Sequence, residues 1–410
     1  MKIKLPKNVQ FIIDQIYKSG YEAFIVGGCV RDSILGLNPN DYDVTTSAPP
    51  SEILNIFKNF KLIDNGIKHG TVGVIIDKEV YEITTYRLEG EYENNRRPKS
   101  VSFTSNLVED LKRRDFTINA IAYNDKMGII DKFDGMTDIK NKIVKTVGEP
   151  DKRFNEDGLR LIRAIRFSSK LNFKIESNTL HSIYKNANII KNISRERITD
   201  EFSKILMGNN PQDIIILYKT GILKSIGVTS NISEEKYDEF EKDLEVLKLI
   251  PSSLIDRLSV LDFIIKYKAY STDSIKDYLV YSSKVKTDST LITKSMLDIL
   301  NIKGNIEIKL KLNEVGIDIL KKALTLSKIY FENSYLEDKI LFNINEIINS
   351  VLEIDKNGEC YKIRDLNING KDIESLGYKG KEIGEILNKL LYKVIVNPYL
   401  NEKDILLSLI

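Results

Sequence analysis

Short apolar runs alternate with helically spaced apolar residues in the first third of the chain. Runs rich in β-branched and aromatic residues predict strands, and they lie at 24–26, 61–63, 70–76, 80–86 and 101–104. Apolar residues three or four positions apart predict short helices at 30–37 and 52–59. This alternation over residues 1–134 predicts an α+β head that is built on a small mixed sheet.

Residues 87–101 interrupt this alternation. The segment is dense in charge and has no hydrophobic period. Loops of this length inside a compact domain are usually functional lids or disordered insertions. We therefore expect a long mobile loop here.

The pattern becomes purely helical beyond the head. Amphipathic segments with short polar breaks fill the C-terminal half, without the period of a helical repeat. We expect an all-α neck, body and tail after the head. The four parts are predicted at 1–134, 135–210, 211–310 and 311–410.

The composition narrows the class of protein only a little. The chain is 42% hydrophobic and 29% charged with a net charge of +2, so any nucleic-acid surface must be local. Two cysteines and two histidines cannot build a disulfide framework or a zinc site, which favours a reducing cytoplasmic location. No run approaches the roughly 18 apolar residues of a membrane span, and the N-terminus is no signal peptide.

A glycine pair and an aspartate pair follow the first strand. Gly27 and Gly28 lack Cβ atoms, so backbone N–H groups there can approach a bulky anion such as a triphosphate. Asp41 and Asp43 are expected on one face of the next strand, because strand side chains alternate with period 2. Two such carboxylates are hard oxygen ligands for Mg²⁺ and suit a two-metal site. Each signal alone is commonly a turn or a solvated loop, but together they resemble the nucleotidyltransferase signature of the polymerase-beta superfamily.

Glu82 is a candidate third acid for this metal site. It shares a face of the strand at 80–86 with Thr84, opposite Tyr81 and Ile83. A solvent-facing carboxylate without a metal is an equally good interpretation.

Paired arginines stand directly before an aspartate at 113–115. Arg113 and Arg114 can donate to phosphates, and Asp115 can accept from a ribose hydroxyl, which would favour ribonucleotides. The alternative is a helix N-terminus with Asp115 as its cap. That alternative does not explain the paired arginines.

A third constellation lies at 155–167, where Asn155 is expected to cap a helix. Asp157 and Arg160 are three residues apart and would project side by side from that helix. The simpler interpretation is a first-turn acid paired with a surface arginine. The chemical interpretation is a base reader, because a carboxylate beside a guanidinium offers one acceptor and one donor. Cytosine and adenine present the matching amino donor and ring-nitrogen acceptor, whereas guanine and uracil present the reverse polarity, which a dry site rejects.

The motifs together resemble the class II tRNA nucleotidyltransferases, the CCA-adding enzymes of bacteria. They occur in the family's order: Gly27-Gly-Cys-Val-Arg-Asp with Asp41-Tyr-Asp, Arg113-Arg-Asp-Phe-Thr, Phe133-Asp-Gly, Glu156-Asp-Gly-Leu-Arg, and Ser194-Arg-Glu-Arg-Ile-Thr-Asp-Glu-Phe. The resemblance implies a polymerase-beta-like head, a base-reading neck, and a tail that binds tRNA.

The resemblance also implies roles for individual residues. Asp41 and Asp43 would be catalytic and bind Mg²⁺, and Glu156 would fix the loop at 87–101 against the base reader. The nucleotide-binding set is expected to be Gly27, Gly28, Arg31, Arg113, Arg114, Asp115, Asn119, Asp157, Arg160, Arg163 and Arg166. The expected partners are tRNA, CTP and ATP, and the sequence leaves a monomer or a homodimer open.

Several other activities remain as alternatives. An enzyme that adds only A or only CC, or a poly(A) polymerase, would share the head motifs. The loop at 87–101 is of full length, which the resemblance associates with complete CCA addition. An inactive RNA-binding protein is disfavoured by the intact aspartate pair.

Overall fold

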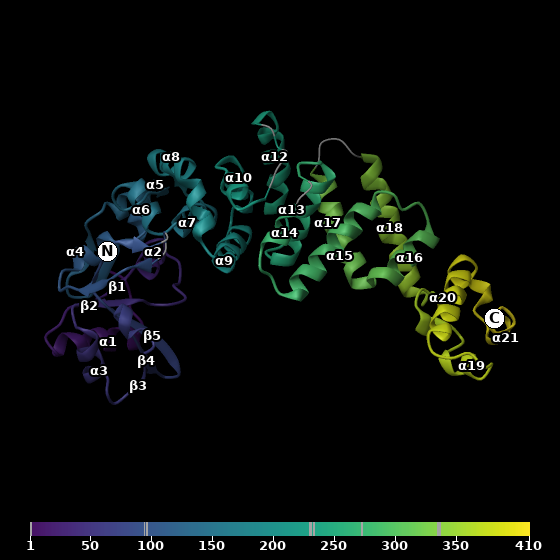
Figure 1. Ribbon diagram of the computed structural model, residues 1–410, viewed down its shortest axis with the longest axis horizontal. Coiled ribbons are helices and arrows are strands. Elements are labelled where there is room, and N and C mark those ends of the chain that lie inside the picture. The colour runs from purple at the N-terminus through teal and green to yellow at the C-terminus, as the bar shows by residue number, and fades with distance from the viewer. Residues whose placement is uncertain are drawn as a thin grey trace. The chain divides into compact units, whose positions relative to one another are not determined.

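The computed structural model describes residues 2–93, 95, 97–228, 232, 234–271, 274–333 and 338–410. The chain divides into two compact units (Figure 1). The first comprises Met1–Thr229 with Tyr278–Val280, and the second comprises Ser230–Asp277 with Tyr281–Ile410.

A seven-stranded sheet forms the base of the first unit, in the order β11-β10-β1-β2-β5-β4-β3. The strands are β1 (Ala23–Val26), β2 (Val44–Thr46), β3 (Lys61–Ile63), β4 (Thr71–Ile76), β5 (Glu79–Thr85), β10 (Ile121–Asn124) and β11 (Gly128–Asp131). β2 and β5 run parallel, and the other neighbouring strands are antiparallel. The predicted mixed sheet is therefore confirmed.

Helices α1 (Lys7–Lys18), α2 (Gly28–Ile34) and α3 (Pro50–Ile56) pack close to this sheet (Figure 1). α1 buries Val9, Ile12, Ile13 and Ile16, which share one helical face because of their spacing. The central strand β1 is buried along its whole length. The sheet thus gives a rigid support to the segment that leaves its end at Gly27.

The segment predicted as an aperiodic loop contains paired strands. β6 (Arg87–Glu89) pairs with β9 (Val101–Phe103), and β7 (Tyr92–Glu93) pairs with β8 (Arg97–Pro98). The sequence did not predict these strands because they are short and are defined by backbone hydrogen bonds. The side chains of β6, β7 and β9 do not alternate between buried and exposed. Residues 94 and 96 of the predicted loop lie outside the described residues.

Helices and short strands complete the first unit. They are α4 (Leu107–Lys112), η2 (Thr117–Asn119), α5 (Gly135–Asn141), β12 (Ile143–Val144), α6 (Pro150–Glu156), α7 (Leu159–Leu171), β13 (Lys174–Ile175), α8 (Ser177–Asn186), η3 (Ala187–Asn192), α9 (Arg195–Leu206), η4 (Pro211–Asp213), α10 (Ile214–Lys219) and α11 (Ile222–Ser225). The predicted helix start at Asn155 is wrong, because Asn155 lies inside α6. A break at Asp157 and Gly158 separates α6 from α7.

The second unit is helical throughout its described residues, as predicted. Its helices are η5 (Glu234–Lys236), α12 (Tyr237–Leu244), η6 (Glu245–Lys248), α13 (Leu254–Tyr267), α14 (Ile275–Tyr278), α15 (Ser283–Ile299), α16 (Asn305–Val315), α17 (Ile317–Glu332), α18 (Asp338–Lys356), η7 (Ile363–Asp365), α19 (Gly370–Glu374), α20 (Lys381–Val396), η8 (Pro398–Leu400) and α21 (Lys403–Ser408). Phe263, Tyr267, Tyr330 and Phe331 pack their rings together between α13 and α17.

The predicted boundaries near 134 and 210 fall within the first unit, and the one near 310 falls within the second. The four-part division therefore stays a prediction. Among the described residues, no helix combines the length and the apolar character that crossing a bilayer requires.

Candidate active site

The glycine pair lies at the junction of β1 and α2. Gly27 has a φ of +82°, a backbone conformation that favours glycine. Its N–H donates to the carbonyl oxygen of Ile121 at 3.2 Å. A Cβ atom on Gly27 would lie 3.1 Å from Nη1 of Arg114, so the missing side chain admits this guanidinium.

Asp41 and Asp43 precede β2, so the prediction that both lie on one face of that strand is wrong. The N–H of Val26 donates to the carbonyl oxygen of Asp43 at 3.1 Å, which holds the segment against the end of β1. Both aspartates are exposed. The preceding Asn38-Pro39-Asn40 breaks the chain, and β2 begins only at Val44, where side chains become buried.

The carboxylates near Asp43 repel one another. Partial removal from water raises the pKa of Asp43, the charges of Asp41 and Glu82 raise it further, and the nearby Arg114 opposes them. Glu82 is exposed and lies on the face of β5 opposite the buried Tyr81, as the alternation predicts. A divalent cation would relieve this repulsion.

The residues at this position fit a magnesium ion that is shared with substrate. Within the described part of the chain, no group of three or more His, Cys, Asp or Glu side chains is arranged to hold a metal ion. Mg²⁺ is commonly bound by one or two carboxylates together with substrate phosphates and water. Asp41 and Asp43 can supply these carboxylates, and the role of Glu82 stays a prediction.

The two consecutive arginines have different surroundings. Arg113 forms ion pairs with Asp110 at 2.7 Å and with Glu89 at 3.1 Å. Arg114 lies beside Gly27, and its Nη2 is 3.5 Å from Asp110. The buried Nε of Arg114 has no hydrogen-bond partner among the described residues, which leaves a donor for an anion.

Asp115 is buried and fully bonded. Nε and Nη2 of Arg163 donate to its Oδ2 at 2.9 and 2.6 Å. The N–H of Phe116 and the amide of Asn119 donate to its Oδ1 at 2.8 and 3.1 Å. Burial raises the pKa of this carboxyl, but Arg163 and the Asn119 hydrogen bond outweigh burial and hold it well below its usual range. Asp115 is therefore a permanent anion.

Three guanidinium groups surround the ring of Phe167 on α7. Those of Arg31, Arg163 and Arg166 lie 5.1, 5.5 and 4.1 Å from its centroid, within the range of cation–π attraction. Glu201 on α9 balances this charge through an ion pair with Arg166 at 2.7 Å. Phe167 and Glu201 thus fix the positions of these arginines.

Arg31 is linked to Asp115 through Asn119. The buried guanidinium of Arg31 donates to Asn119 Oδ1 at 2.6 Å and forms an ion pair with Asp32 at 2.6 Å. Because its oxygen accepts from Arg31, the Asn119 amide is oriented with its nitrogen toward Asp115.

The predicted pairing of Asp157 with Arg160 on one helix is wrong. Asp157 lies in extended backbone between α6 and α7, where it forms an ion pair with Arg197 of α9 at 3.1 Å. Arg160 instead forms an ion pair with Glu156 at 2.7 Å and donates to the carbonyl oxygen of Arg113 at 3.0 Å. The extended backbone of Asp157 interrupts the helix, so the spacing of Asp157 and Arg160 does not place them on one helical face.

The described part of the loop contacts the α6–α7 break through Asn95. Its side-chain amide donates to the carbonyl oxygen of Asn155 at 2.6 Å, and its carbonyl oxygen accepts from the N–H of Gly158 at 3.0 Å. The side chain of Glu156 accepts from Arg153 and Arg160. Glu156 lines one cavity with loop residues 88–92, and its role in positioning the loop stays a prediction.

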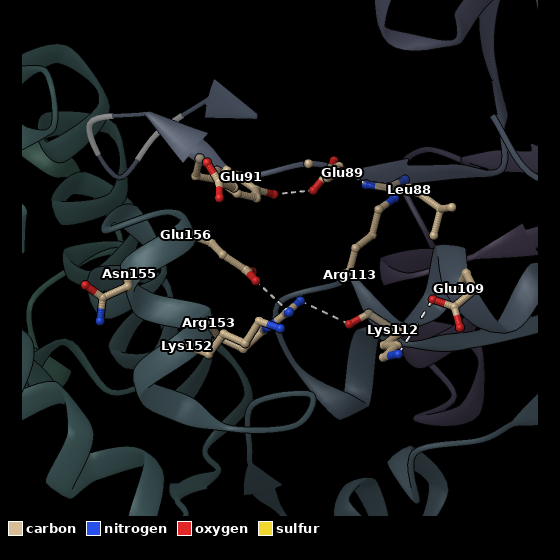
Figure 2. A pocket seen from close by; sticks show the side chains of 12 residues that line it. Leu88, Glu89, Glu91, Glu109, Lys112, Arg113, Lys152, Arg153, Asn155 and Glu156 are labelled. Carbon is tan, nitrogen blue, oxygen red and sulfur yellow. Dashed lines mark hydrogen bonds and ion pairs between the residues drawn. The ribbon is translucent and has the colours of Figure 1, made fainter. Parts of the chain in front are cut away.

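A cavity of about 680 Å³ lies between the loop strands, α4 and α6 (Figure 2). Its lining includes Glu89, Tyr92, Arg113, Arg153 and Glu156. It shares Arg113 and Glu156 with the predicted site but contains neither Asp41 nor Asp43. The cavity therefore borders the site without being its catalytic centre.

Sequence reasoning missed the partners that hold the site residues in place. They are Asp110, Phe167, Arg197 and Glu201. The last two lie in the motif at 194–202, which the resemblance treated as helix-stabilising. The spacing of Asp110 to Arg113 and Arg114 could have indicated ion pairs, but the burial of Asp110 and its contacts with Thr45 and Arg87 arise only in the fold.

Comparison with family models gives two matches along the first unit. Residues 23–145 match the poly A polymerase head domain. Residues 172–227 match a probable RNA and SrmB-binding site of polymerase A.

Two similar proteins cover nearly the whole chain. A CCA-adding enzyme of Ligilactobacillus salivarius is 38% identical over 410 residues, with 97% of this chain and 94% of the relative covered. A CCA-adding enzyme of Pediococcus pentosaceus is 34% identical over 407 residues, with 98% and 96% covered.

Solved structures have the same fold. The Bacillus stearothermophilus CCA-adding enzyme in complex with CTP superimposes with a TM-score of 0.73 at 30% identity, covering 98% of this chain and 95% of that one. The Thermotoga maritima CCA-adding enzyme complexed with tRNA has a TM-score of 0.66 at 22% identity, covering 99% and 96%, and it supports the fold alone.

Proposed function

The chain belongs to the family of CCA-adding enzymes, and from this premise we propose that it adds C, C and A to the 3′ end of tRNA from CTP and ATP. In each addition the terminal hydroxyl oxygen of the RNA bonds to the α-phosphorus of the nucleotide. The bond from that phosphorus to the bridging oxygen breaks, and pyrophosphate leaves. The observation that supports the proposal is that Asp43, held against the end of β1, is acted on by the charges of both Asp41 and Arg114.

The exposed aspartates would hold the metal. Mg²⁺ bound by Asp41 and Asp43 would lower the pKa of the attacking hydroxyl and neutralise the departing pyrophosphate. Arg114 would donate its free Nε–H to the triphosphate, and Gly27 leaves the space in which this guanidinium lies.

The ribose site would be built on Asp115. The carboxylate of Asp115 already accepts four hydrogen bonds, so a ribose hydroxyl would take the place of part of the Arg163 contact. Arg163 would then move toward the nucleotide. Arg31 would act indirectly, by orienting the Asn119 amide that donates to Asp115. Arg166 would also act indirectly, through its ion pair with Glu201.

Asp157 and Arg160 would select the base through the directions of their hydrogen bonds. Asp157 would accept from the exocyclic amino group, and Arg160 would donate to the ring nitrogen beside it. Because Arg197 and Glu156 hold these side chains apart from each other, base binding must draw them to one edge. Guanine and uracil would leave both groups mismatched, at a cost of about 1–3 kcal/mol for each unsatisfied partner.

We infer that the protein acts in the cytoplasm, because its proposed substrates are tRNA and nucleoside triphosphates. The second unit, with its helical tail, would bind the tRNA outside the reacting end. This assignment accounts for a helical half that contains none of the predicted catalytic residues.

Two truncated tRNAs test the proposal. With CTP, ATP and Mg²⁺, a tRNA that ends before CCA should gain three nucleotides, and a tRNA that ends in CC should gain one A. A CC-adding enzyme would stop after two nucleotides on the first tRNA, and an A-adding enzyme would extend only the second. A poly(A) polymerase would give long A tails, and an inactive RNA-binding protein would extend neither.

A further inference from the structure

Asp110 is a buried carboxylate that none of the predicted roles uses. It lies on α4, and its side chain has 0% of its surface exposed. Such a group requires partners, because an unpaired buried charge is strongly unfavourable. Its hydrogen-bond and ion-pair partners among the described residues belong to segments that build the candidate active site.

Its two oxygens have separate sets of partners. Oδ1 accepts from Nε and Nη2 of Arg113 at 3.0 and 2.7 Å and from the N–H of Arg87 at 3.3 Å. Oδ2 accepts from Oγ1 of Thr45 at 3.3 Å and lies 3.5 Å from Nη2 of Arg114. One carboxylate therefore contacts both arginines, the first residue of β6 (Arg87), and β2 (Thr45), the strand that follows Asp43.

Three acids act on Arg114, and Asp115 is one of them. Asp110 contacts its Nη2, while Asp43 acts on it electrostatically from the side of the metal-binding aspartates. Without the charge of Asp110, the guanidinium would be free to turn toward Asp43. There it would compete with a metal ion and withdraw Nε from the triphosphate.

We propose that Asp110 is a positioning residue for nucleotidyl transfer, which acts by holding Arg114 in the orientation that binds the nucleotide triphosphate. The inference rests on the proposed function. It assigns Asp110 a role through Arg114 and no contact with the substrate.

A double-mutant cycle in the full-length protein separates this role from general stabilisation. Asp110→Asn keeps the shape of the side chain and removes its charge. We expect it to weaken CTP binding about tenfold, the loss typical of one misplaced charge-assisted hydrogen bond. In an Arg114→Gln background, the same change should have almost no further effect, because the group that it positions is gone.

Asp262→Asn provides the matched control in the second unit. Asp262 is equally buried and forms ion pairs with Lys276 at 2.8 Å and Lys266 at 3.1 Å. Its substitution should lower the unfolding temperature as Asp110→Asn does, but CTP affinity should stay at the wild-type value.

Isothermal titration with CTP and Mg²⁺, together with kcat on truncated tRNA, supplies the readouts. The inference would be overturned if Asp110→Asn lowered CTP affinity equally in the wild-type and Arg114→Gln backgrounds. It would also be overturned if the Asp110→Asn single variant bound CTP as tightly as the wild type. If Asp110→Asn does not fold, the same cycle is run with Asp110→Glu, which retains the charge but displaces the guanidinium. A wild-type protein that fails to extend tRNA would instead refute the proposed function.

Discussion

Asp43 and Asp115 have opposite electrostatic surroundings, although both belong to the candidate site. Partial burial and the neighbouring acids raise the pKa of Asp43, whereas Arg163 and hydrogen bonds outweigh burial and lower that of Asp115. A carboxylate that is repelled in the free protein gains most from a cation that arrives with substrate. A carboxylate that is already satisfied serves as a fixed acceptor.

Replacing Asp43 with Asn should abolish transfer yet stabilise the free protein. Because the folded pKa of Asp43 lies above its unfolded value, its ionised form at pH 7 disfavours folding, and Asn removes that effect. The gain should shrink as pH falls and Asp43 becomes protonated. Thermal unfolding in EDTA at pH 7 and at pH 4 measures it.

Asp200→Asn is the control for this prediction. Asp200 is an exposed acid that pairs with Lys204, and its removal should change neither unfolding nor activity measurably. An Asp43→Asn variant that is less stable than the wild type in EDTA would show that the acids do not repel one another.

Replacing Asp157 or Arg160 with Ala should damage nucleotide choice more than metal binding. Each variant loses one half of the donor–acceptor pair that distinguishes C and A from G and U. Selectivity should fall by about tenfold or more, since each 1.4 kcal/mol is a factor of ten. Incorporation from each of the four nucleotides, measured singly, checks this expectation. Unchanged selectivity in both variants would remove the base-reading role.

At the scale of elements, the break between α6 and α7 determines where Asp157 and Arg160, the proposed base-reading residues, lie. It places Asp157 in extended backbone beside Arg197, and it exposes the N–H of Gly158 to Asn95. Gly158 is required by packing: a Cβ atom there would lie 2.7 Å from Cγ2 of Ile189. The junction therefore depends on close contact between the break and η3.

Gly158→Ala should destabilise the first unit and reduce selectivity together. The added methyl group overlaps Ile189, and overpacking of this kind costs about 1–3 kcal/mol. Chemical denaturation and the four-nucleotide assay measure the two effects. Gly384→Ala is the control for stability, because space is open around Gly384 within α20, and this change should be neutral or slightly stabilising.

The same junction shows how far the sequence could predict this protein. The head sheet and the helical second half follow from the hydrophobic period. That Asp41 and Asp43 bind a metal follows from residue chemistry and stays a prediction. Spacing could not reveal the extended backbone of Asp157 that separates α6 from α7. Arg197 was missed because it lies far from Asp157 in the sequence. Asp110 was missed, although Arg113 and Arg114 follow it closely, because its burial and its contacts with other segments arise only in the fold.

At the scale of the whole molecule, the chemistry is expected in the first unit, and tRNA binding is expected to extend from residues 172–227 of that unit to the second unit. CTP with Mg²⁺ should slow amide exchange in the first unit, especially at 24–31, 113–119 and 155–166. A tRNA should extend protection to the second unit. Hydrogen exchange followed by mass spectrometry measures both, and GTP provides the control because it should leave 155–160 unprotected. Equal protection of both units by CTP alone would contradict the division.

The most direct test of complete CCA addition is to sequence the products that the wild-type protein makes on a tRNA ending before CCA. All four nucleotides should be present at equal concentration, so that the protein alone determines the order of addition. The account predicts a single dominant product that ends in C, C and A and is not extended further. Products that contain G or U at these positions, that stop after two nucleotides, or that carry a run of A would contradict it.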